Sequence, residues 1–110
     1  MSNASDLESR LLKLIFDFSL SVKTMQDIDA ARVSEIESTC LDLIRIHKPL
    51  NSVSKPLAAN LYAYPHSIEA EASYSSDKEL LLDHCQKMQS YFGMLLAQQT
   101  PEDRSHGQII

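Results

Sequence analysis

Two cysteines and two of the four histidines are the residues that could hold a metal ion. Cys40 and His47 lie on one face of a predicted helix, and His84 and Cys85 are adjacent on another. Zinc needs ligands that converge in a tetrahedron, whereas adjacent helical side chains diverge by about 100°. We therefore expect no metal and no other cofactor. We interpret both cysteines as small buried hydrophobic residues, with a Cys40–Cys85 disulfide as the alternative.

Acid–base or nucleophilic chemistry would need side chains that face one another. Asp83 and His84 are neighbours and Glu35 and Glu37 are two residues apart, so on a helix the members of each pair point in different directions. The chain has only two glycines, which excludes a glycine-rich phosphate loop. We therefore predict that the protein is not an enzyme. On this interpretation the carboxylates are surface charge, and His84 is a boundary residue at the edge of an apolar seam.

The charge is acidic and unevenly distributed. Fifteen Asp and Glu against ten Lys and Arg give a net charge of −5, which argues against nucleic acid as a partner because DNA-binding proteins usually carry a basic stripe. Residues 43–68 nonetheless contain Arg45, Lys48 and Lys55 and no acid, whereas residues 69–83 contain five acids and one lysine. The acidic segment could steer a basic partner. The basic segment, residues 45–55, supports an alternative function as a homodimeric regulator that contacts nucleic acid.

The chain shows no sign of a membrane segment or a secretion signal. No apolar run approaches the roughly 18–20 residues that a membrane span requires, and no cationic segment precedes an apolar one. The two cysteines are far apart in sequence, which is typical of a reducing compartment. We predict a cytoplasmic protein with a leader or tag remnant at residues 1–4, one domain at residues 5–99 and a flexible polar tail at residues 100–110.

Apolar residues recur at spacings of three and four along the whole chain, which is the periodicity of α-helices. The pattern predicts an all-α fold, a small antiparallel bundle of about four helices. Capping boxes at Ser5 and Ser76, an N-cap at Asp27 or Asp29, and Ser54 before a proline mark the helix starts. The expected helices cover residues 5–25, residues 27 or 29 to 48, residues 56–74 with a break or kink at Pro65, and residues 76–99.

The first predicted helix is apolar on two sides. One face belongs to the expected core, and a second stripe, Leu12, Phe16 and Leu20, lies roughly opposite. Such a helix is either central in a bundle or shared with another chain. Soluble monomers seldom leave a large apolar patch in water, so we expect the other helices to cover the stripe. A homodimer interface is the close alternative.

A second candidate surface is the stretch around Tyr62, Tyr64 and His66. Tyrosine is enriched at protein interfaces because it combines apolar area with a polar tip. The alternative is that both tyrosines cover one end of the bundle with their hydroxyls in water. The stretch lies between the basic segment and the acidic one, so we keep it as a candidate recognition site, although the covering role is the preferred interpretation.

These observations lead to a functional hypothesis: a non-enzymatic, intracellular protein-binding module, such as an inhibitor or immunity-type neutraliser, a chaperone or an adaptor. A small-molecule site lined by His47, His84 and Tyr91 is a weaker hypothesis. The candidate partner-binding residues are Leu12, Phe16, Leu20, Tyr62, Tyr64, His66, Glu69 and Glu71. The expected core is Leu11, Leu14, Phe18, Ile36, Cys40, Leu43, Leu81, Cys85, Met88, Phe92 and Leu95.

Overall fold

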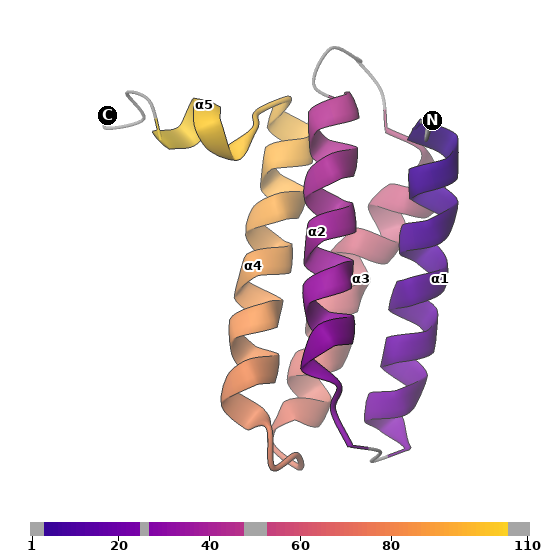
Figure 1. Ribbon diagram of the computed structural model, residues 1–110, viewed down its shortest axis with the longest axis vertical. Coiled ribbons are helices and arrows are strands. Elements are labelled where there is room, and N and C mark those ends of the chain that lie inside the picture. Colours follow the sequence, from indigo (N-terminus) through magenta and orange to yellow (C-terminus); the bar gives the residue numbers. More distant parts are fainter. Residues whose placement is uncertain (1–3, 25–26, 48–52, 106–110) are drawn as a thin grey trace.

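The computed structural model describes residues 4–24, 27–47 and 53–105, and within them it shows helices and no strand (Figure 1). The all-α prediction is therefore confirmed. The helices are α1 (Ala4–Lys23), α2 (Ala30–His47), α3 (Lys55–Ala72), α4 (Lys78–Ala97) and the short α5 (Pro101–Ser105). None of them is long and apolar enough to cross a membrane.

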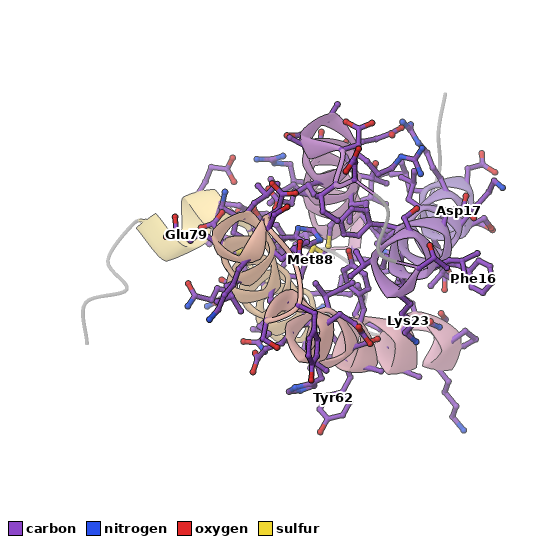
Figure 2. All side chains as sticks on the ribbon, turned by 90° about the horizontal axis from the view of Figure 1, so that it is seen from below. Phe16, Asp17, Lys23, Tyr62, Glu79 and Met88 are labelled. Atoms are coloured by element: carbon purple, nitrogen blue, oxygen red, sulfur yellow. The ribbon has the colours of Figure 1, made fainter. Side chains whose placement is uncertain are left out.

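The four long helices form a bundle of two antiparallel hairpins, α1–α2 and α3–α4 (Figure 1). The hairpins pack together through α1 against α3 and α2 against α4. Seen from below, the order around the bundle is α1, α2, α4, α3 (Figure 2). Two helix pairs therefore lie diagonally opposite, α1 with α4 and α2 with α3, and only a side chain that crosses the centre can join them.

Two of the predicted helix starts are confirmed by their capping bonds. The carboxylate of Asp29 accepts a hydrogen bond from the backbone N–H of Ala31 at 2.9 Å, so Asp29 and not Asp27 is the N-cap of α2. The hydroxyl of Ser54 accepts from the N–H of Leu57 at 3.2 Å at the start of α3. Pro56 lies in the first turn of α3, where its missing N–H is not needed.

The two predicted capping boxes are not formed. Helix α1 begins at Ala4, so Ser5 lies inside the first turn, and the carboxylate of Glu8 accepts from the hydroxyl of Ser54 instead. Helix α4 begins at Lys78, and its N-cap Asp77 makes no side-chain capping bond. Before α4, the hydroxyl of Ser75 accepts a hydrogen bond from the N–H of Asp77 at 3.0 Å.

Helix α3 runs through Pro65 without a break. The predicted break is therefore wrong, and the predicted kink is not confirmed. Proline removes one hydrogen bond from a helix interior. Pro65 is buried, and its carbonyl oxygen accepts a hydrogen bond from the Cys85 thiol of α4 at 3.3 Å. Packing between α3 and α4 therefore supports the helix at the position where its own bonding is weakest.

Within the predicted polar tail the structure describes residues 100–105, which include the short helix α5, and residues 106–110 lie outside the described residues. Helix α4 ends at Ala97, and Gln98 follows in the left-handed conformation (φ 56°). Thr100 and Asp103 then cap α5 reciprocally: the Thr100 N–H donates to the Asp103 carboxylate at 2.9 Å, and the Asp103 N–H donates to the Thr100 hydroxyl at 3.2 Å. The guanidinium of Arg45 lies 2.9 Å from the Glu102 carboxylate, which ties α5 to α2.

The core agrees with the expected one except at two edge positions. Leu14 and Phe92 are only partly buried and pack against the core, whereas the other expected members are buried. The pattern missed the contribution of α3. The buried residues of that helix are Leu57, Leu61, Tyr64, Pro65, Ile68 and Ala72.

Candidate functional site

Two large apolar side chains of α1, Phe16 and Leu20, are in contact with water. Phe16 is 68% exposed and Leu20 is 54% exposed, so the expectation that the bundle covers this stripe is wrong. Helix α1 contacts α2 and α3 only through its opposite face, on which Leu11 and Phe18 lie. Figure 2 shows Phe16 directed away from the bundle. Leu12 is the one member of the stripe that packs partly against the core.

A groove of about 200 Å³ runs beside Phe16, between α1 and α3. Its α3 side carries small residues, among them Ala63 and Ser67, and Lys23 is the charged residue of its lining. An exposed aromatic ring therefore stands next to a hollow that a side chain of another molecule could enter. We call Phe16, Leu20 and this groove the α1–α3 surface.

The candidates on α3 are divided between its two sides. Tyr62 is 65% exposed and packs edge-on against the exposed ring of His66, with ring centroids 5.4 Å apart. Glu69 is also exposed. Tyr64 is only 3% exposed, and it belongs to the lining of the groove of the α1–α3 surface. Side chains two apart on a helix point in different directions, which is why Tyr62 and Tyr64 have opposite environments.

The remaining candidates do not join the α1–α3 surface. Glu71 is partly buried and lines a separate cavity of about 280 Å³, together with Asp27, Tyr74 and Asp77, at the end of the bundle where the helices of each hairpin connect. In the basic segment, Arg45 is already paired with Glu102, as described above. Lys55 is exposed at the start of α3, and Lys48 lies outside the described residues.

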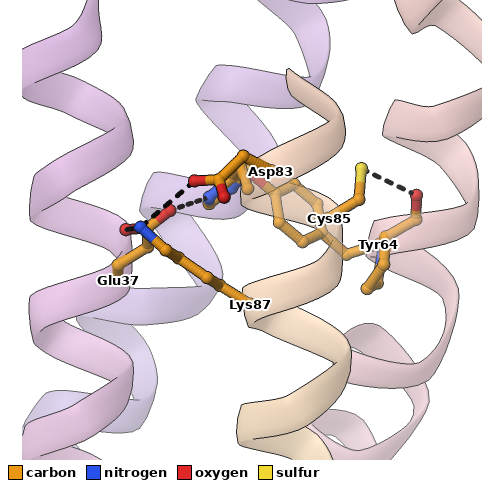
Figure 3. Close-up of polar contacts among 7 residues, drawn as sticks. Glu37, Tyr64, Asp83, Cys85 and Lys87 are labelled. Atoms are coloured by element: carbon orange, nitrogen blue, oxygen red, sulfur yellow. Dashed lines mark hydrogen bonds and ion pairs between the residues drawn. The ribbon is translucent and has the colours of Figure 1, made fainter. Parts of the chain in front are cut away.

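The centre of the bundle contains a polar cluster that the sequence did not predict (Figure 3). The N–H at Nδ1 of His84 lies 2.7 Å from the Glu37 carboxylate, and Nε2 lies 2.6 Å from the Tyr64 hydroxyl. His84 is fully buried, so its predicted place at the edge of the seam is wrong. Glu37 is not simple surface charge either, because its side chain is 15% exposed and bonds inward.

Hydrogen bonding assigns the protonation state of this cluster. A neutral imidazole that carries its hydrogen on Nδ1 donates to the Glu37 carboxylate and accepts from the Tyr64 hydroxyl, so each group finds a matching partner. Burial lowers the pKa of His84, although the hydrogen bond to Glu37 acts in the opposite direction. Lys87 lies 3.7 Å from Glu37 and 3.1 Å from Asp83 and covers the outer side of the cluster.

The order carboxylate, imidazole, hydroxyl is the order found in sites of nucleophilic catalysis. Here the imidazole and the hydroxyl are enclosed, and burial raises the pKa of Tyr64, which disfavours the phenolate. Glu37 comes from α2, Tyr64 from α3 and His84 from α4. The cluster therefore joins three helices through side chains of which His84 and Tyr64 are buried.

Both cysteines are buried free thiols. Burial raises the pKa of Cys40 to about 12 and that of Cys85 to about 11, which keeps both protonated at neutral pH. Among the residues that the structure describes, no three His, Cys, Asp or Glu side chains are grouped so that they could hold a metal ion. His47 is also buried, and its ring lies against the carbonyl oxygen of Leu43 at 3.2 Å.

Comparison of the chain with protein families, curated proteins and solved structures gave no match. The functional argument therefore rests on the α1–α3 surface and the central cluster. No local spacing could have revealed the cluster, because Glu37 and Tyr64 lie 47 and 20 residues from His84. One signal was available in the sequence: His84 is next to Cys85, which was expected in the core. A buried histidine requires hydrogen-bond partners, so its position could have predicted a polar cluster.

Proposed function

We propose that this protein is a non-enzymatic protein-binding module and that another protein docks on the α1–α3 surface. The observation that carries the proposal is the exposure of Phe16 and Leu20 beside a groove. Burying one such side chain stabilises a complex by about 1.5–3 kcal/mol before other costs. The exposed ring is therefore an energetic anchor of the kind found at interface hot spots.

The shape of the surface fits an amphipathic helix of the partner. Grooves between two helices accept the apolar face of a third helix, and the small side chains of α3 allow close approach. Lys23 has no ion-pair partner among the described residues. It would favour an acidic side chain next to the apolar face of the incoming helix.

An inhibitor, a neutraliser, a chaperone or an adaptor would each use a surface of this kind, and we place the protein in the cytoplasm. The two free thiols support a reducing compartment. The alternative based on residues 45–55 is less favoured by the geometry, because the Arg45 guanidinium is engaged by a carboxylate.

The test is a site-specific photo-crosslinker placed at position 16 in cells, with position 96 as the matched control. Leu96 is 57% exposed and lies on α4, diagonally across the bundle from α1. We expect a discrete covalent adduct from position 16 and none from position 96. A tagged Phe16→Ser/Leu20→Ser variant should lose the same partner, while Leu96→Ser should retain it.

Two results would contradict the proposal: adducts at position 96 alone, or equal recovery of the partner by the double variant. The α1–α3 surface could instead bind a second copy of the same chain. Light scattering on the pure protein tests this by measuring the mass of the assembly. If the wild type has twice the mass of one 12.4 kDa chain and the double variant has the mass of one chain, the surface binds a second copy of this protein. That result would replace the proposal of a different partner.

A further inference from the structure

We propose that the contact of His84 with Glu37 and Tyr64 is an acid-sensitive latch, in which a proton on Nε2 of His84 weakens the packing of α4 against α2 and α3. This inference does not depend on the proposed function. It concerns the interior of the bundle, whereas the docking surface lies on the outside of α1 and α3.

The first argument is the position of His84, which touches every long helix. It belongs to α4, bonds to Glu37 of α2 and Tyr64 of α3, and packs edge-on against the ring of Phe18 of α1, with centroids 5.8 Å apart. It also bridges the two diagonal helix pairs. A change in its charge therefore acts on all four helices at once.

The second argument is the hydrogen-bond balance. Neutral His84 satisfies both of its nitrogens, and within the described part of the chain no buried side-chain nitrogen or oxygen lacks a partner. Protonated His84 would donate from both nitrogens, so the Tyr64 hydroxyl would have to become an acceptor. Its own hydrogen would then have no partner, because His84 is the only hydrogen-bond partner of this hydroxyl among the described residues. Leaving a buried donor unpaired is costly.

The charged groups around His84 act in both directions. Glu37 of α2 and Asp83 of α4 favour a proton on His84, while Lys87 of α4 opposes it, as does burial, the largest contribution. Helix α3 presents the neutral Tyr64 hydroxyl, and α1 presents the uncharged ring of Phe18. The net result is a His84 pKa below its ordinary value.

The sign of the pH effect follows. In the unfolded chain His84 has a pKa of about 6.5, and in the folded chain its pKa is lower. Below pH of about 6.5 the unfolded state binds more protons, so folding becomes less favourable as the pH falls. The decrease of the folding equilibrium constant from this source steepens as the unfolded state becomes protonated, and it approaches about tenfold per pH unit well below pH 6.5, until His84 is also protonated in the folded state.

The experiment is urea unfolding of the wild type, His84→Gln and His66→Gln at pH 7.5, 6.5 and 5.5. His66 is exposed on α3, so His66→Gln is the matched control. We expect the folding equilibrium constant of the wild type and of the control to fall between pH 7.5 and 5.5, with a contribution of about tenfold over this range that is absent from His84→Gln. The same pH dependence in all three proteins would overturn the proposal.

A second measurement covers the case in which His84→Gln does not fold. Ring ¹⁵N shifts of the folded wild-type protein, assigned with variants of the other three histidines, His47, His66 and His106, report the state of His84 directly. The latch requires a neutral ring with its hydrogen on Nδ1 that does not titrate between pH 7.5 and 5.5. Titration of the folded protein near pH 6.5, or a hydrogen on Nε2 at pH 7.5, would overturn it.

Discussion

The centre of the bundle and the outer side of α1 depart from ordinary packing in opposite ways: the centre buries polar side chains, and the outer side of α1 exposes apolar ones. At the centre, a carboxylate, an imidazole and a hydroxyl are surrounded by apolar side chains, and each is hydrogen-bonded. On α1, the large apolar side chains of Phe16 and Leu20 are mostly exposed to water. Departures from the general rules of packing concentrate at functional positions. The comparison therefore separates an interior that maintains the fold from the outer side of α1, on which we propose that a partner docks.

The strongest test of this contrast uses two phenylalanines of one helix. Phe18 is 2% exposed, so Phe18→Ala should leave a cavity and lower the free energy of unfolding by about 3–5 kcal/mol. Phe16→Ala should change it by no more than about 0.5 kcal/mol, yet abolish partner binding. Urea unfolding of both variants measures the difference. Similar losses would mean that Phe16 is part of the core and would remove the contrast.

A pair of tyrosines gives a smaller effect and isolates the polar contribution. Tyr64→Phe removes the hydroxyl from His84 and leaves Nε2 unpaired, at a cost of about 1–3 kcal/mol. Tyr62→Phe removes a hydroxyl that is already in water and should be close to neutral. Thermal unfolding at pH 7.5 compares the two. A neutral Tyr64→Phe would show that the central hydrogen bond does not stabilise the bundle.

The smallest effect concerns an exposed position with a structural role. Asp29→Ala removes the N-cap of α2 and should lower the free energy of unfolding by about 0.5–2 kcal/mol. Asp27→Ala, two residues earlier, should have little effect because Asp29 already caps the helix. Urea midpoints of the two variants provide the measurement. Equal effects would mean that both aspartates stabilise α2 through their charge and not through a specific hydrogen bond.

Much of the fold could be predicted because helices leave local signals. The spacing of apolar residues gave the class and the four long helices, and polar caps such as Ser54 and Asp29 gave two of the starts. The continuity of α3 through Pro65 could not be predicted in this way. It depends on α4 packing against the proline turn, and local propensity contains no information about that contact.

The site was harder to predict because exposure depends on which helices are neighbours. The sequence showed the apolar stripe with Phe16 and Leu20, but the prediction that other helices cover it was wrong. The sequence does not show which face of α1 packs against α2 and α3. The central cluster is a purely tertiary feature. Its three side chains come from three helices: Tyr64 and His84 meet within the α3–α4 hairpin, and Glu37 joins them only when the two hairpins have packed together.

The His84 contact also has a consequence for the register of the two hairpins. Leucine and isoleucine side chains are interchangeable enough that one hairpin could slide along the other by a helical turn, about 5.4 Å, and still bury apolar area. Such a slide would carry His84, together with Tyr64 of the same hairpin, away from Glu37 of the other hairpin and leave Nδ1 of the buried His84 without its acceptor. Directional bonds at one central residue therefore select a single alignment of the hairpins, which apolar packing alone would specify less sharply.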